Sequence, residues 1–197
     1  MVNVYLLNNP DKIDEQYKLG EPTKILDYNN DNEVLSFIKT IKKYDTEYDK
    51  IVLQISQTSS SEVCLFLLNY ICENKLLKFF EIKDEFDNKI IHYICKTQNE
   101  TCIMRILDIY EQFKLNFEVS CNDNLMPIHI ICIFQDEKCV MRILDIYEKF
   151  GLNFEARAQD YKPIHIICRK QNQNCVMRIL DIYERLGLNF EVYSFLI

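Results

Sequence analysis

Each of the three histidines in this chain is followed, three residues later, by a cysteine. The histidines are His92, His129 and His165, and the cysteines are Cys95, Cys132 and Cys168. On a helix, residues three apart share a face, so each pair could offer an imidazole and a thiolate to a metal ion. The same two groups could also act as a nucleophile and its base. Whether these pairs form a metal or catalytic site, or have only a structural role, depends on the helices that carry them.

Those pairs belong to an internal repeat. The octet MRILDIYE begins at Met104, Met141 and Met177, which are 37 and 36 residues apart, and the His and Cys pairs keep the same spacing. Stacked helices lie about 8–10 Å apart, whereas metal–ligand bonds are about 2.0–2.3 Å long. A catalytic cluster, moreover, breaks a repeat rather than following it. We therefore expect no metal, no cofactor and no catalytic residue, and we expect the six side chains to be structural.

The repeat divides the chain. Three full units cover residues 85–121, 122–158 and 159–194, and a short apolar tail runs to residue 197. A degenerate unit is predicted at 49–84, where Phe79-Phe80-Glu81 matches Asn116-Phe117-Glu118. Residues 1–48 are interpreted as an N-terminal cap or a further degenerate repeat, in which Asn30 and Glu33 resemble a helix capping box. Met1–Leu7 could be a short strand or an extended arm.

Each unit is predicted to form two helices and a loop. The first helix is short and apolar, as in 127–132, and Pro127 suits its first position. The second helix carries apolar residues at a 3.6-residue period, at positions 140, 143, 144, 147 and 150. Gly151 and Gly187 suit a left-handed residue after the helix, whereas Lys114 specifies that end less well. In each octet an Arg and an Asp three residues apart could form an intrahelical ion pair. The fold class is therefore all-α, a helical repeat solenoid of paired antiparallel helices with projecting loops.

These residues resemble the ankyrin repeat. Pro127–Cys132 and Pro163–Cys168 are similar to its Thr-Pro-Leu-His opening and following Leu-Ala-Ala, and Ile90-Ile91-His92 is similar without the Pro. Val140-x-x-Ile143-Leu144 and then Gly151-Leu152-Asn153 resemble its second helix and end. The threonine is missing, and three extra residues in the second helix account for a period of 36 instead of 33. The Ile-, Asn- and Lys-rich style also resembles ankyrin proteins of giant DNA viruses of amoebae.

The resemblance implies a protein-binding module that is not an enzyme. It implies that each His hydrogen-bonds within and between units, and that each Cys takes a small buried position. It also implies that the concave face and the loop tips contact a partner protein. There the units differ, and Phe134 and Tyr161 are aromatic residues in polar surroundings, although either could be an incidental surface aromatic. The predicted partner-binding residues are Phe134, Gln135, Asp136, Tyr161, Arg169 and Lys170.

Composition bounds the remaining classes of function. The net charge is −7 and the pI is about 5.1, which argues against nucleic-acid binding. No run approaches the roughly 20 apolar residues of a membrane span. Nine cysteines without a signal peptide indicate an intracellular protein, expected in the cytoplasm, or in the host cytoplasm if it is viral.

Two alternatives to a binding module stay open. One is a metal- or redox-responsive Cys/His protein. The other is a structural module that self-assembles through the apolar C-terminal edge, at residues 192–197. We expect a monomer rather than a homo-oligomer, with the tail folded back over that edge, because large exposed apolar patches are rare in monomers.

Overall fold

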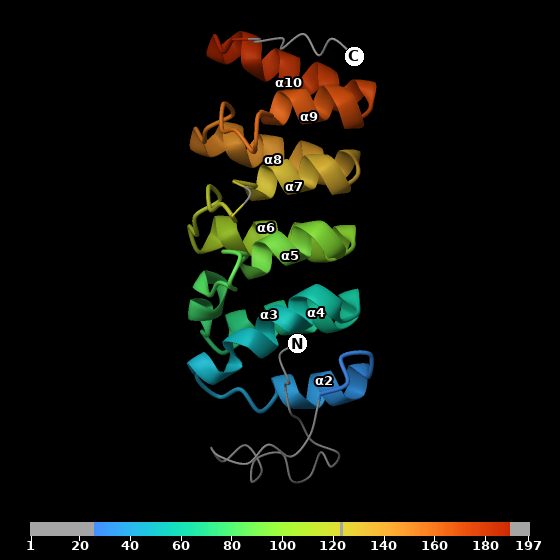
Figure 1. Ribbon diagram of the computed structural model, residues 1–197, viewed down its shortest axis with the longest axis vertical. Coiled ribbons are helices and arrows are strands. Elements are labelled where there is room, and N and C mark those ends of the chain that lie inside the picture. The colour runs from blue at the N-terminus through green and yellow to red at the C-terminus, as the bar shows by residue number, and fades with distance from the viewer. Residues whose placement is uncertain (1–25, 123, 190–197) are drawn as a thin grey trace. The chain divides into compact units, whose positions relative to one another are not determined.

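All regular elements in the described part of the protein are helices. The computed structural model describes residues 26–122 and 124–189. These residues contain no β-strand, and an isolated bridge joins Ala158 to Tyr161. The predicted all-α class is therefore confirmed there (Figure 1). The predictions for Met1–Leu7 and for the tail at 192–197 lie outside the described residues.

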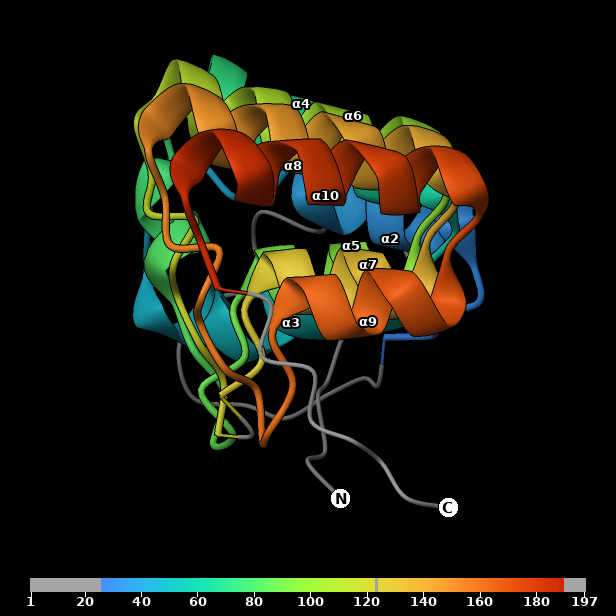
Figure 2. The ribbon, with the colours of Figure 1, turned by 90° about the horizontal axis from the view of Figure 1, so that it is seen from above.

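The chain divides into two compact units, residues 1–116 and 117–197. In the first unit, α3 packs on α5, α4 packs on α6, and α2 packs on α4. Helices α4 and α6 thus form one layer of this unit, and α3 and α5 form the other (Figure 2). Its elements are α2 (Asp31–Ile38), η2 (Thr46–Tyr48), α3 (Asp49–Thr58), α4 (Ser61–Glu73), η3 (Leu77–Glu81), α5 (Ile90–Thr97) and α6 (Glu100–Gln112).

The second unit repeats this arrangement with four helices. They are α7 (Pro127–Phe134), α8 (Glu137–Phe150), α9 (Pro163–Lys170) and α10 (Gln173–Leu186). Helix α7 packs on α9, and α8 packs on α10, so short helices and long helices form separate layers (Figure 2). The eight-residue helices α7 and α9 are linked to the 14-residue helices α8 and α10 by short polar turns.

The helix starts follow local sequence. Pro127 and Pro163 occupy the first turn of α7 and α9, as predicted. Asn30 caps α2, where its side chain accepts a hydrogen bond from the Glu33 N–H at 3.3 Å. Each long helix starts in the same way, with a polar side chain that accepts from the N–H three residues later. These caps are Ser60, Asn99, Asp136 and Asn172.

A residue in the left-handed backbone conformation follows each of the long helices α6, α8 and α10. Gly151 and Gly187 have φ of 63° and 62°, as predicted. Lys114, which was expected to specify the end of α6 less well, has the same left-handed conformation, with φ of 54°. The Leu115 N–H donates to the Tyr110 carbonyl at 2.9 Å, matching the bond from Leu152 to Tyr147. These hydrogen bonds hold the lysine in a conformation that glycine adopts at less cost.

The core is built from the apolar faces of the helices. On α8, the predicted face is buried at Val140, Ile143, Leu144 and Tyr147. Phe150 is the exception, since 45% of it is exposed at the last position of the helix. Its assignment to the buried face is therefore wrong, because the chain turns away directly after it.

Buried tyrosines of α6, α8 and α10 each bond to the segment that follows the preceding long helix. The Tyr110 hydroxyl donates to the Phe80 carbonyl at 3.2 Å, and the Tyr147 hydroxyl to the Phe117 carbonyl at 3.3 Å. The Tyr183 hydroxyl donates to the Phe154 carbonyl at 2.9 Å. Each octet thus places one polar atom in the core and satisfies it there.

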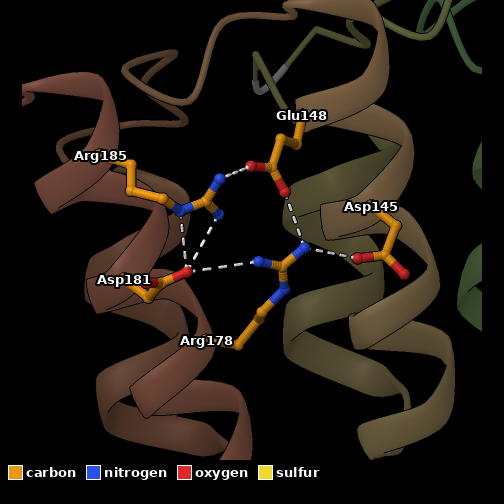
Figure 3. A network of polar contacts seen from close by, with 5 residues as sticks. All are labelled: Asp145, Glu148, Arg178, Asp181 and Arg185. Atoms are coloured by element: carbon orange, nitrogen blue, oxygen red, sulfur yellow. Dashed lines mark hydrogen bonds and ion pairs between the residues drawn. The ribbon is translucent and has the colours of Figure 1, made fainter.

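Arginines link neighbouring long helices in the second unit. Arg178 of α10 bonds Asp145 and Glu148 of α8, both at 2.7 Å, and Arg185 also bonds Glu148 (Figure 3). The expected pair within α10, Arg178 with Asp181, is longer at 3.5 Å. In the first unit, Arg105 donates to Asn69 of α4 at 2.8 Å. For Arg178, the expected ion pair within the helix is therefore longer than its bonds to the neighbouring helix.

Candidate partner-binding groove

The three histidines close the starts of the short helices. Each Nδ1 accepts a hydrogen bond from a backbone N–H three residues earlier: Lys89 to His92 at 2.9 Å, Met126 to His129 at 3.2 Å, and Lys162 to His165 at 3.2 Å. With Nδ1 an acceptor, the proton of neutral His129 sits on Nε2, which lies 3.1 Å from the Ala156 carbonyl. His129 therefore fastens α7 to the loop after α8, and burial lowers its pKa.

The thiols are poorly suited to chemistry. Burial raises the pKa of Cys64 to about 12 and that of Cys102 to about 11, and burial also raises the pKa of Cys132. The thiolate is the reactive and metal-binding form, so these groups stay protonated at neutral pH. In residues 26–122 and 124–189, no group of three or more His, Cys, Asp or Glu side chains could hold a metal ion.

One cysteine departs from the expected burial. Cys95 and Cys132 are buried, but Cys168 is exposed. Cys132 lies under α9, and its carbonyl accepts from Gln171 at 2.8 Å. Helix α9 is the last short helix of the described chain, and no further short helix covers Cys168 there. The prediction of a buried Cys168 is therefore wrong.

The second unit has a groove of about 270 Å³ beside α7 and α9. Its floor is buried and apolar, at Ala158 and Ile166. Its walls are half-buried, at Leu125, Ile133 and Tyr161. Its rim is exposed and polar, at Gln159, Arg169 and Lys170. The groove thus combines apolar contact area with two cations on one side.

A tight turn positions one wall of the groove. The N–H of Ala158 donates to the Tyr161 carbonyl, and the N–H of Tyr161 donates to the Ala158 carbonyl, both at 3.0 Å. Gln159 at the tip has a positive φ of 54°, a backbone conformation that favours glycine. These two hydrogen bonds close the turn and fix the backbone of Tyr161, which places its side chain at the wall of the groove.

The structure gathers three of the six predicted partner-binding residues in this groove. Tyr161, Arg169 and Lys170 all line it. Phe134 is 50% exposed at the end of α7 and is outside the lining.

The other two predicted contacts have structural roles. The Asp136 carboxylate caps α8 by accepting from the Cys139 N–H at 3.1 Å. The Gln135 carbonyl accepts from the Gln171 side chain at 3.0 Å. Gln98 sits at the equivalent repeat position and donates to the Ser56 and Ser59 carbonyls, both at 3.3 Å. Asp136 and Gln135 lie in a polar turn whose sequence differs between units, but both make hydrogen bonds that stabilise the repeat itself.

Sequence reasoning missed an exposed aromatic in the first unit. Phe86 is 56% exposed in the loop before α5. Asp84 orders this loop by accepting from the Phe86 N–H at 2.8 Å, from the Asn88 N–H at 2.7 Å, and from the Tyr93 hydroxyl. Phe86 is an aromatic residue among charged neighbours, so the criterion that selected Phe134 and Tyr161 would also have found it. The apolar groove residues Ile133 and Ile166 were missed as well, because a helical pattern does not distinguish a half-covered face from a core face.

Comparison with protein-family models, with curated proteins and with solved structures finds no match. Among the described residues, no helix is long and apolar enough to cross a membrane.

Proposed function

We propose that the chain is an ankyrin-like repeat protein that binds another protein and catalyses no reaction. The groove beside α7 and α9 would contact the partner, together with neighbouring loop tips. The ankyrin likeness is supported by short and long helices that alternate along the chain. It is further supported by the Pro-Ile-His start of α7 and α9, and by the hydrogen bond from His129 to the next loop.

The observation that carries the proposal is the composition and size of the groove. Its volume of about 270 Å³ is below the range of about 300–1,000 Å³ typical of small-molecule sites. An apolar floor with a polar, charged rim is the arrangement of a protein contact patch. A groove of this size suits one or two side chains of a larger partner.

The buried thiols favour this reading over a metal- or redox-responsive protein. Their raised pKa values oppose both metal binding and oxidation, which proceed through the thiolate. An intracellular location is part of the proposal, and the free state of all nine cysteines supports it. Self-assembly through residues 192–197 concerns a segment outside the described residues.

A capture experiment with matched variants tests the proposal. Purified chain is immobilised, and proteins bound from a cell lysate are quantified by mass spectrometry for wild type, Ile133→Ser/Tyr161→Ala and Phe150→Ala. The control Phe150 is an exposed aromatic on the long-helix layer. We expect at least one protein to bind wild type and Phe150→Ala and to fall about tenfold or more with the groove variant, since contact aromatics often contribute 1.4 kcal/mol or more. If the groove variant keeps its fold by circular dichroism and every bound protein is unchanged, the groove is not the interface.

A further inference from the structure

The two cations at the groove rim are the feature that goes beyond a general contact surface. Arg169 and Lys170 lie in the last turn of α9, and both are exposed. Within residues 26–122 and 124–189, neither side chain makes a hydrogen bond or an ion pair. Both charges therefore remain available to an incoming ligand.

Other cations of the same unit are already engaged. Arg178 is held by Asp145 and Glu148, and Arg185 is held by Glu148 and Asp181 (Figure 3). Lys162 lies next to the groove turn but is buried and paired with Glu155. Arg178, Arg185 and Lys162 are thus paired with carboxylates of the same unit, whereas Arg169 and Lys170 line the groove.

Among residues 26–122 and 124–189, no carboxylate lines the groove and could neutralise the pair. Besides Arg169 and Lys170, the described residues of the lining are Leu125, Ile133, Ala158, Gln159, Tyr161 and Ile166. The whole chain is acidic, with a net charge of −7. A ligand rich in carboxylates would be repelled by much of the acidic surface and attracted by Arg169 and Lys170. The charge distribution would therefore direct such a ligand to the groove.

We propose that the groove binds a segment of another protein in which an apolar side chain lies beside one or more Asp or Glu residues. The apolar side chain packs on Ala158 and Ile166, between Ile133 and Tyr161. A carboxylate of the segment accepts hydrogen bonds from the Arg169 guanidinium, whose planar fork matches two carboxylate oxygens, and Lys170 adds a second charge. This inference rests on the proposed binding function and names the chemistry of the partner.

Selection from a random peptide library provides the first test. A library of displayed 12-residue peptides is selected against the full chain at low salt, and binders are sequenced. We expect enrichment of Asp or Glu within a few positions of Leu, Ile, Phe or Met. Enriched peptides that are neutral or basic yet lose binding in Tyr161→Ala would overturn the acidic partner while leaving the groove as a binding site. If no peptide depends on the groove residues, the proposed function fails with it.

Charge reversal provides the second test. One selected peptide and its amide version, with Asp→Asn and Glu→Gln, are titrated by fluorescence anisotropy. We expect Arg169→Glu/Lys170→Glu to weaken the acidic peptide at least tenfold and to leave the amide version within about twofold, because only the charge contribution is reversed. Lys149→Glu is the matched control, since Lys149 is also an exposed cation in the last turn of a helix, α8.

Salt and a competing polyanion complete the design. Binding of the acidic peptide should weaken several-fold between 50 and 500 mM NaCl, because exposed charges are screened over about 3–10 Å at roughly 0.1–1 M salt. A single-stranded 12-mer oligonucleotide is tested as a competitor. If the oligonucleotide binds through Arg169 and Lys170 and the acidic peptides do not, the ligand is a nucleic acid and the inference is wrong.

Discussion

At the residue scale, single positions close the long helices by adopting a left-handed backbone. Gly151 and Gly187 do so without a side chain, and a Cβ at either position would meet no atom within 4 Å. Lys75 and Lys114 adopt the same conformation with φ of 58° and 54°. Since space is not limiting, the difference between lysine and glycine at these sites is a difference of backbone energy.

A reciprocal pair of substitutions isolates that energy. Gly151→Ala should lower the free energy of unfolding by about 1 kcal/mol, because a non-glycine residue in the left-handed region costs roughly 1–2 kcal/mol, partly offset by chain entropy. Lys114→Gly should raise it by up to about 1 kcal/mol for the same reason. Urea denaturation followed by circular dichroism measures both. A destabilising Lys114→Gly would show that the lysine side chain contributes more than its backbone conformation costs.

At the scale of elements, the tyrosine of each octet does more than pack. Its ring lies in the core, and its hydroxyl reaches a carbonyl of the loop that follows the preceding long helix. Tyr183 is fully buried, and burial together with the nearby Glu155 carboxylate raises its pKa. The Tyr183 hydroxyl therefore keeps its proton, and its hydrogen bond to the Phe154 carbonyl fixes the distance between α10 and the loop after α8.

Removing one hydroxyl tests this link. Tyr183→Phe leaves the Phe154 carbonyl without its donor in a water-poor site, which should cost about 1–3 kcal/mol of unfolding free energy. Tyr161→Phe is the control, because Tyr161 is half-buried and water can reach its surroundings. Chemical denaturation of both variants gives the comparison. Equal losses, or no loss in Tyr183→Phe, would mean that the ring alone stabilises the packing.

At the scale of the whole molecule, charge and protonation connect stability to pH. His129 is held neutral, since burial lowers its pKa below the usual 6.5 while the bond to Ala156 opposes that shift in part. Hydrogen bonds from Arg185 and Arg178 lower the pKa of Glu148 below 4.5. In both cases the unfolded chain binds protons more readily than the folded one at acid pH, so acid favours unfolding.

Stability should therefore fall as the pH drops from 7.5 to 5.5. The unfolded chain begins to protonate His129 near pH 6.5, whereas the folded protein does so only at lower pH, and the contribution of Glu148 is lost below about 4.5. Denaturation midpoints at the two pH values measure the effect. An NMR titration of the His129 ring should give a pKa below 6.5, and a value at or above 6.5 would contradict the assigned neutral state.

Much of the fold could be predicted from the sequence, because helix starts, helix ends and apolar faces depend on residues close together in the chain. Proline at the start of α7 and glycine after α8 act through their own backbone preferences, so their roles follow from their positions alone. The 3.6-residue apolar period likewise identified most of the buried face of α8. Prediction failed at Phe150, which is exposed at the last position of its helix, and at Cys168, which no further short helix covers in the described part of the chain.

By itself the sequence determined the helical class, the alternation of short and long helices, and the structural use of His129. These follow from periodicity, helix-end chemistry and a residue repeated in register. Only the tertiary structure decided that Tyr161, Arg169 and Lys170 share one groove, and that Cys168 is exposed. The physical reason is that a groove is formed by what packing leaves uncovered, and that depends on distances between segments that no local pattern encodes.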